Sequence, residues 1–183
     1  MYLLAGLLSC ALTSCGNSES PDAKNPDAKN PAAKNPGEAV KLALAKQSAP
    51  LDNVLCSGQP TEAQFDTLKA AGVSRVVHLR LAKEKGTGWE EARAKDSGVE
   101  FVRLEIAGKD GLTRENVDAF AKLMAKETTG KTLVSCGSSN RVGAMFALKA
   151  FWIDKLPRDE ALALGKKAGM KSLTPVVEAL TAE

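Results

Sequence analysis

Apolar and polar positions change their spacing several times along the chain after residue 50. Short runs rich in valine and leucine predict strands over 53–57, 74–79, 99–106 and 132–135. Apolar residues at helical spacing predict helices over 61–71, 89–95, 113–126, 141–152, 158–168 and 175–180, and a helical lead-in over 38–46. Strands that alternate with helices favour parallel pairing with helices packed on the sheet. We therefore expect residues 38–183 to form an α/β domain with a central, mostly parallel sheet of about four to five strands flanked by helices.

The first 15 residues have a different pattern. Residues 1–15 are apolar and too short to span a bilayer as a mature helix. Leu12-Thr13-Ser14-Cys15 fits the bacterial pattern that is cut before a cysteine, which then receives lipid. We expect a lipoprotein-type signal peptide ending at Cys15, with Cys10 as a second site. An ordinary secretory peptide or an uncleaved apolar tail is the alternative, because no Lys or Arg precedes the apolar run.

A repeat separates this segment from the domain. Residues 16–37 contain Pro-Asp-Ala-Lys-Asn units, and a proline recurs every five residues from Pro21 to Pro36. Prolines at this spacing prevent regular helix and sheet, and few apolar side chains are available for a core. We expect a disordered tether. Together with a lipid on Cys15, it predicts an exported bacterial lipoprotein held at a membrane of the cell envelope, on the periplasmic or surface-facing side.

Composition narrows the classes of function. A hydrophobic content of 44% and a charged content of 26% are typical of a globular domain. The net charge of +3, without a basic stripe, does not indicate a nucleic-acid partner. His78 is the only histidine, and no zinc-ligand spacing, Ser-His-Asp order or dinucleotide glycine fingerprint is present. We therefore expect no metal and no cofactor, and interpret His78 as a residue of the core or of a strand end.

The chemistry concentrates between Cys136 and Arg141. The cysteine ends an apolar strand, and the arginine begins a helix after a loop of small residues, Gly137, Ser138, Ser139 and Asn140. Such residues tolerate tight turns, and a helix N-terminus favours an anion. A thiolate there is a nucleophile, while a guanidinium binds two oxygens of a phosphate. We expect Cys136 to attack, and Arg141 and the four loop residues to bind phosphate. A buried structural cysteine is the alternative.

Two segments together resemble a known family. Ser57-Gly58-Gln59-Pro60, continued to Phe65 and followed by Val76-Val-His-Leu-Arg80, precedes the loop from Cys136 to Arg141. This order resembles the bacterial beta-lactamase-hydrolase-like phosphatase family of the cysteine-dependent, dual-specificity and tyrosine phosphatase-like superfamily, over about residues 51–152. The resemblance implies a Cys-phosphatase-like fold and hydrolysis of phosphate monoesters through a thiophosphoryl intermediate on Cys136. The phosphorylated substrate stays unspecified. Gln59, at the end of the first strand, is expected to face the pocket.

The resemblance also implies a general acid. Related phosphatases carry an aspartate on a loop upstream of the cysteine. The matching stretch here contains Asp110-Gly111 between a predicted strand and a predicted helix, and we assign the role to Asp110. Asp118 and Glu105 are weaker candidates. The alternative is a turn residue, since Asp-Gly is common turn chemistry.

Several positions depart from the family pattern. Ser135 stands where a histidine usually precedes the cysteine, Ser139 stands at a usual glycine, and Val142 replaces a hydroxyl residue. The loop holds four residues between Cys136 and Arg141, a length similar to that of rhodanese loops. Two alternatives follow, namely a catalytically weak or inactive phosphate-binding module and a rhodanese-like sulfurtransferase using a Cys136 persulfide. Cys56 is expected to be buried and unpaired, with a Cys56–Cys136 disulfide as the alternative.

Overall fold

The computed structural model describes residues 44, 46–48 and 51–182 of the chain. The expected signal peptide with Cys15, the repeat tether and most of the lead-in helix lie outside the described residues. The described residues belong to one compact unit, which runs over 39–183. In this part of the chain, every helix is too short or too polar to cross a membrane.

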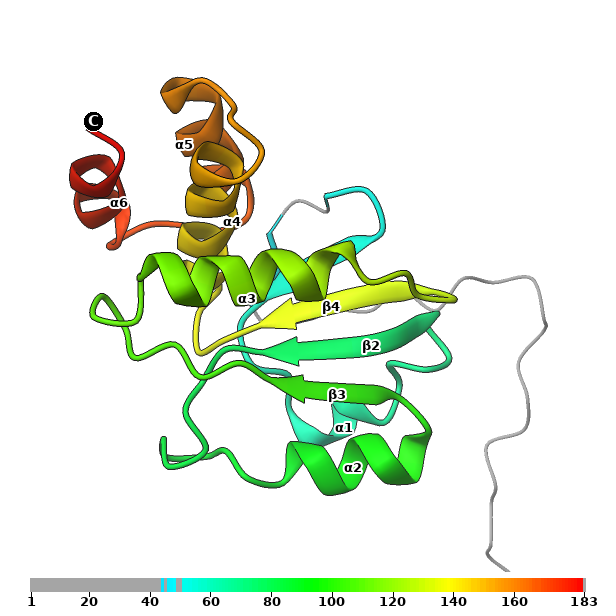
Figure 1. Cartoon of the computed structure of the whole chain (residues 1–183). Helices are drawn as coiled ribbons and strands as arrows, with labels where there is room; N and C mark the ends of the chain where they lie inside the picture. The colour runs from blue at the N-terminus through cyan, green and yellow to red at the C-terminus, as the bar shows by residue number, and fades with distance from the viewer. Residues whose placement is uncertain (1–43, 45, 49–50, 183) are drawn as a thin grey trace, which may run out of the picture. The chain divides into compact units, whose positions relative to one another are not determined.

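Four strands form one parallel sheet in the order β1-β4-β2-β3 (Figure 1). Their bounds are β1 Val54–Ser57, β2 Val73–His78, β3 Glu100–Arg103 and β4 Lys131–Ser135. The predicted α/β class with a mostly parallel sheet is confirmed. In a parallel sheet all carboxyl ends meet at one edge, so Ser57, His78, Arg103 and Ser135 end their strands on the same side of the domain.

Helices cover both faces of the sheet. Their bounds are α1 Glu62–Phe65, α2 Glu90–Ser97, α3 Arg114–Ala125, α4 Asn140–Trp152, α5 Arg158–Lys167 and α6 Thr174–Leu180. In Figure 1, α1 and α2 lie on one face, α3 and the start of α4 on the other, and α5 packs against α4. Thr61 and Thr113 cap the starts of α1 and α3, because each hydroxyl accepts a hydrogen bond from the backbone N–H three residues later.

Alternation along the central strands creates a core on each face. Val76 and Leu133 pack with residues of α1 and α2, whereas Val77 and Val134 pack with residues of α3, α4 and α5. All four side chains are fully buried. This double burial explains why the strands read as nearly continuous apolar runs in the sequence.

Two elements are shorter than predicted. The expected helix over 61–71 is regular only as α1, and the chain then continues in turns whose N–H groups bond three residues back, as Leu68 does to Phe65. The strand expected over 99–106 ends at Arg103. Beyond it the backbone still follows β2, because Leu104 N–H donates to His78 and Ile106 N–H donates to Leu79. Both differences are in length, and the topology stays as expected.

Candidate active site

Cys136 lies where the edge of the sheet meets the start of α4. It directly follows β4, and its N–H donates to the Ser57 carbonyl of β1 at 3.3 Å. The residue is 1% exposed, so the thiol lies at the base of the loop rather than on the surface. The next residues turn sharply, and α4 begins at Asn140. Strand, loop and helix N-terminus therefore follow one another as the sequence predicts.

Arg141 reaches from the first turn of α4 across the strand ends. Its Nη1 donates to the Leu79 carbonyl at 3.3 Å and to the Ile106 carbonyl at 2.8 Å, which ties α4 to the segments after β2 and β3. Glu84 raises the pKa of the Arg141 guanidinium, burial opposes this, and the nearby Cys136 raises it further. The side chain is 14% exposed. Cys136 is thus near enough to Arg141 to influence its guanidinium, and the roles of the two residues stay predictions.

Glu84 is the partner of Arg141 that the sequence did not indicate. Its two carboxylate oxygens accept from Arg141 Nη1 at 2.6 Å and from Nη2 at 2.8 Å. Arg80 Nε and the Leu81 N–H also donate to this carboxylate, both at 2.9 Å. These hydrogen bonds, with that from Arg141 the strongest, hold the pKa of Glu84 far below its usual range. The only available signal was the Arg80-to-Glu84 spacing, which is too common to identify a site.

A hollow of about 300 Å³ opens at this point. Its walls are Glu84, Gly108, Ser138, Asn140, Arg141 and Leu173. They come from the loop after β2, the loop after β3, the Cys136 loop and the segment before α6. A hollow of this size holds a small anionic group, and Arg141 is the cation in its wall. Its partner Glu84 lies in the same wall, so an entering anion meets a guanidinium that is already paired.

The loop residues divide into two groups. Gly137 is exposed, and Ser138 is half-buried and lines the hollow. Ser139 is in the left-handed region at φ +65°, and its buried hydroxyl donates to the Ala168 carbonyl at 2.9 Å. Asn140 accepts the Lys171 N–H at 2.7 Å through its side-chain oxygen. The Ser139 and Asn140 side chains thus hold the segment after α5, which leaves the loop backbone and Ser138 for a ligand.

Asp110 lies on the loop that borders the hollow. The loop contributes Gly108 to the wall, and Asp110 is exposed two residues further on, without an ion pair among the described residues. Gly111 is required there, because a Cβ atom would overlap the Ala107 backbone nitrogen. The weaker candidates are engaged elsewhere. Asp118 pairs with Arg114 at 3.4 Å, and Glu105 accepts the Ala82 N–H at 2.6 Å.

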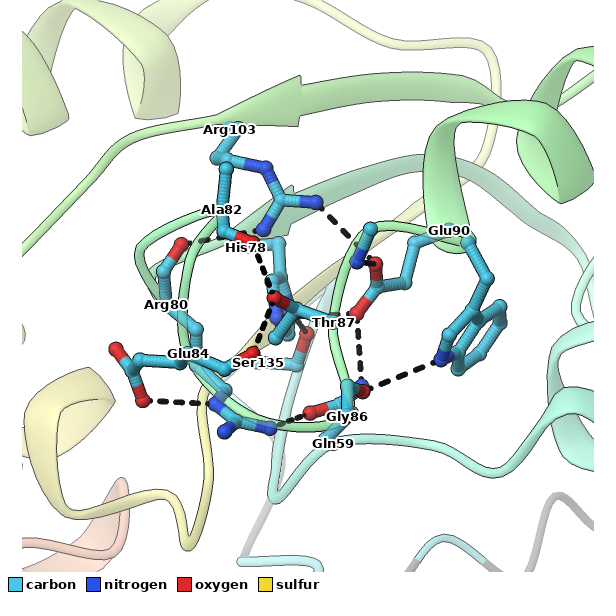
Figure 2. A network of polar contacts seen from close by, with 12 residues as sticks. Gln59, His78, Arg80, Ala82, Glu84, Gly86, Thr87, Glu90, Arg103 and Ser135 are labelled. Atoms are coloured by element: carbon cyan, nitrogen blue, oxygen red, sulfur yellow. Dashed lines mark hydrogen bonds and ion pairs between the residues drawn. The ribbon is translucent and has the colours of Figure 1, made fainter.

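Gln59 belongs to a polar network that organises the loop between β2 and α2 (Figure 2). Its amide nitrogen donates to the Gly86 carbonyl at 2.6 Å and to Glu90 at 2.7 Å, and its oxygen accepts from Arg80. Arg80 in turn donates to Glu84. Gln59 is outside the wall of the hollow and connects to Arg141 only through Arg80 and Glu84.

His78 and Ser135 meet under the same network. They are partners in the register of β2 and β4, and His78 Nδ1 lies 2.8 Å from the Ser135 hydroxyl. His78 Nε2 lies 3.5 Å from the buried Glu90 carboxylate. Burial lowers the pKa of His78 despite the opposing effect of Glu90, so the ring is neutral near pH 7. The lone histidine is therefore a buried strand-end residue of β2, and it lies opposite Ser135, the residue that precedes Cys136 on β4.

Cys56 and Cys136 are both free thiols within one core cluster. Burial raises the pKa of Cys56 to about 12, which makes it an inert thiol near neutrality. Cys56 is therefore buried and unpaired, as expected, and it forms no disulfide with Cys136 in the structure.

Comparisons with known proteins point in one direction. The model of the family described as DSP-PTPase phosphatase fused to NAD+ kinase matches residues 39–173. Beta-lactamase hydrolase-like proteins from two strains of Xylella fastidiosa are each 29% identical over 122 residues, which cover 64% of this chain. The matched part spans only 28% of the length of those curated relatives.

Solved structures agree on the fold. A DUF442 phosphatase candidate from Shewanella putrefaciens has a TM-score of 0.60 at 23% identity, covering 76% of this chain and 88% of its own. TpbA of P. aeruginosa, solved in complex with pTyr, has a TM-score of 0.54 at 17% identity, covering 73% of this chain and 87% of its own. Likeness at such identities concerns the fold, and it confirms the predicted Cys-phosphatase-like architecture.

Proposed function

Because the chain belongs to the family described as DSP-PTPase phosphatase fused to NAD+ kinase, we propose that it hydrolyses phosphate monoesters at Cys136. One observation carries the proposal. Arg141 lies in the wall of a hollow large enough for a phosphate group, and the buried Cys136 lies at the start of the loop whose Ser138 lines the same hollow. The family supports a phosphatase of the dual-specificity type, and the route of the reaction described next is part of the proposal.

The route begins at sulfur. The Cys136 thiolate attacks phosphorus, the new S–P bond forms, and the P–O bond to the substrate alcohol breaks. The loop backbone, Ser138 and Arg141 bind the phosphoryl oxygens, whose charge a guanidinium stabilises best through its planar fork. Water then attacks the thiophosphoryl group, releases inorganic phosphate and restores the thiolate. Cys136 suits this role because it lies within one residue of β4, whose pairing with β1 and β2 holds it in place.

Asp110 supplies and recovers the proton in this scheme. It protonates the leaving alkoxide in the first step and removes a proton from the attacking water in the second. Its position supports the role, because it lies on the 107–112 loop that borders the hollow through Gly108.

The test is hydrolysis of an aryl phosphate by the full chain. Cys136→Ser is expected to abolish turnover, while Asp110→Asn lowers kcat by about 10²-fold and loses the basic side of the pH profile. Asp118→Asn is the matched control, because its partner Arg114 lies on the surface of α3. Undiminished turnover by Cys136→Ser would overturn the proposal. A persulfide on Cys136, detected by mass spectrometry after thiosulfate treatment, would instead support sulfur transfer.

A second candidate rests on the same geometry. Glu84 occupies both terminal nitrogens of Arg141, and a carboxylate in the wall opposes an incoming dianion. This favours the alternative of a weak or inactive site, in which turnover is slow. Glu84→Gln separates the two readings. In an active enzyme it lowers turnover, because the guanidinium loses its support. In a weak one it raises both phosphate affinity and turnover, because the opposing charge is removed.

We also propose that Cys15 carries a lipid that attaches the protein to a membrane of the cell envelope. The support is the Leu12-Thr13-Ser14-Cys15 motif and the proline-rich repeat that follows it. Metabolic labelling with a fatty acid is expected to label the full chain and to be lost in Cys15→Ser. Label retained in that variant would transfer the assignment to Cys10.

A further inference from the structure

A second hollow lies next to the first and has a different chemistry. It measures about 250 Å³ and shares Ser138 with the hollow at Arg141. Its lining is Lys46, Gln47, Ser48, Ser138, Ser139, Lys166, Lys167, Gly169 and Lys171. Four of these side chains are lysines, and no carboxylate is among them. The two hollows therefore meet at one residue of the Cys136 loop.

The four lysines have no ion-pair partner among the described residues, although ion pairs hold many other cations of the domain. All four are exposed, so each ammonium group is free to turn into the hollow. Positive charges gathered without a counter-charge repel one another. A bound anion would remove this repulsion.

The end of α5 does not neutralise these charges. Lys166 and Lys167 are in its last turn, where a helix normally presents unpaired carbonyl groups. Here the Gly165 and Lys166 carbonyls accept from the Met170 and Gly169 N–H groups, and the Ala168 carbonyl accepts from the Ser139 hydroxyl. Ammonium groups rather than free carbonyls are thus what this wall offers a ligand.

The wall is attached to the catalytic loop. The Ser139 hydroxyl also lies 3.0 Å from the Ser48 hydroxyl, and the Ser48 N–H donates to Cys56 of β1 at 2.9 Å. Gly169 is in the left-handed region at φ +103°, and a Cβ atom there would overlap Ser48 and Ser139. Residues before β1, in the Cys136 loop and after α5 are therefore held in one arrangement, with Ser139 at its centre.

We propose that the hollow lined by Lys46, Lys166, Lys167 and Lys171 binds a second phosphate group of the substrate. The substrate class is then a small-molecule phosphate monoester that carries another phosphate, such as a sugar bisphosphate. The scissile group enters the hollow at Arg141, and the second group reaches the lysines across Ser138. The inference rests on the proposed phosphatase function, since it specifies the substrate of that site.

The first test compares a matched pair of substrates. Fructose 1,6-bisphosphate and fructose 6-phosphate are offered to the full chain, and phosphate release is measured. We expect kcat/KM to favour the bisphosphate, and the preference to fall about tenfold in the double variant Lys167→Gln/Lys171→Gln. The control is Lys95→Gln/Lys122→Gln, which removes the same charge from surfaces outside both hollows and keeps the preference. Equal kcat/KM values, or equal losses in both double variants, would overturn the proposal.

The second test does not need turnover. Calorimetry on full-length Cys136→Ser protein measures the Kd of the same two sugars. We expect the bisphosphate to bind more tightly, and this difference to disappear when Lys167→Gln/Lys171→Gln is added. That result supports the second subsite even if the unmodified chain hydrolyses no phosphate ester. Equal Kd values for the two sugars would exclude the subsite, while hydrolysis of an aryl phosphate would leave the phosphatase proposal standing.

Discussion

Two arginines, a buried one and a half-buried one, lie at opposite ends of the same sheet. Arg75, near the start of β2, has a side chain that is 2% exposed, and Arg141, beyond the end of β4, has one that is 14% exposed. Arg75 donates to Glu100 at 2.9 Å and to the carbonyls of Leu123, Lys126 and Glu127. Arg141 also meets a carboxylate and two carbonyls, but it lines a hollow and neighbours a thiol.

The difference separates a structural arginine from the arginine that the proposed reaction requires. The donors of Arg75 are used within the protein, so it fastens the segment after α3 to the sheet. Arg141 has similar partners, yet its guanidinium also faces space that a ligand can enter. Burial and hydrogen bonding alone thus do not identify a functional arginine. The adjoining hollow and the proposed nucleophile Cys136 are what distinguish Arg141 from Arg75.

Replacing Arg141 is expected to have the largest effect on activity. Arg141→Lys keeps the charge and loses the fork, and we expect kcat/KM for an aryl phosphate to fall by about 10²–10³-fold. Steady-state kinetics measures the change, and thermal unfolding checks that the protein is folded. Arg75→Lys is the matched control and is expected to retain kcat/KM within about twofold. Similar losses in both variants would contradict the distinction.

Arg75→Met should have the largest effect on stability. It removes the hydrogen bonds that Arg75 donates to the carbonyls of Leu123, Lys126 and Glu127, although the Leu123 carbonyl still accepts from the Lys126 N–H. The free energy of unfolding is expected to fall by about 3 kcal/mol. Urea unfolding measures this value. Activity per folded molecule should remain, because Arg75 lies near the start of β2, whereas the hollow lies beyond the carboxyl ends of the strands. A loss below about 0.5 kcal/mol would show that these bonds add little.

Glu84 and Glu100 are the carboxylate partners of the two arginines, and we expect them to affect the pH dependence of stability differently. Hydrogen bonds hold the pKa of Glu84 well below the ordinary value of 4.5, so its contribution to stability is present above that pH. The contribution is lost as pH falls through the lower folded-state pKa. We expect unfolding free energy to decline in acid less steeply for Glu84→Gln than for the unmodified chain. Glu100→Gln should change this slope less, because Glu100 is 38% exposed and solvent screens its interactions.

The last prediction concerns His78, whose effect on stability is confined to acid pH. Burial lowers its pKa from 6.5, so the unfolded chain binds more protons than the native one just below that pH. Stability is then full above about pH 6.5 and declines as pH falls, by at most about 1.4 kcal/mol per pH unit. The neighbouring Glu90 opposes the shift and so narrows the pH range over which stability falls, while Arg103, Arg80 and Arg141 widen it. His78→Asn should remove this part of a pH series of urea unfolding curves, and an unchanged slope would contradict it.

Local pattern predicted much of the fold and part of the site. The run that ends at Ser135 and the helix from Asn140 follow from apolar spacing, and the small residues between them require a tight turn. Gln59 illustrates the limit. Its place after the first strand was correct, but its amide is directed to Gly86 and Glu90. That direction depends on a loop between β2 and α2 whose course no periodicity describes.

The parallel α/β order and the loop from Cys136 to Arg141 could be predicted from the sequence, because both depend on the short-range spacing of apolar and small residues. The pairing of Glu84 with Arg141 and the presence of four lysines around one hollow depend on the tertiary structure. Glu84 and Arg141 are 57 residues apart, and the lysines extend from the segment before β1 to the segment after α5. Glu84 and Arg141 meet because parallel pairing brings the strand ends, and the loops that leave them, to one edge. The lysines meet because Ser139 ties both Ser48 and the end of α5 to the Cys136 loop.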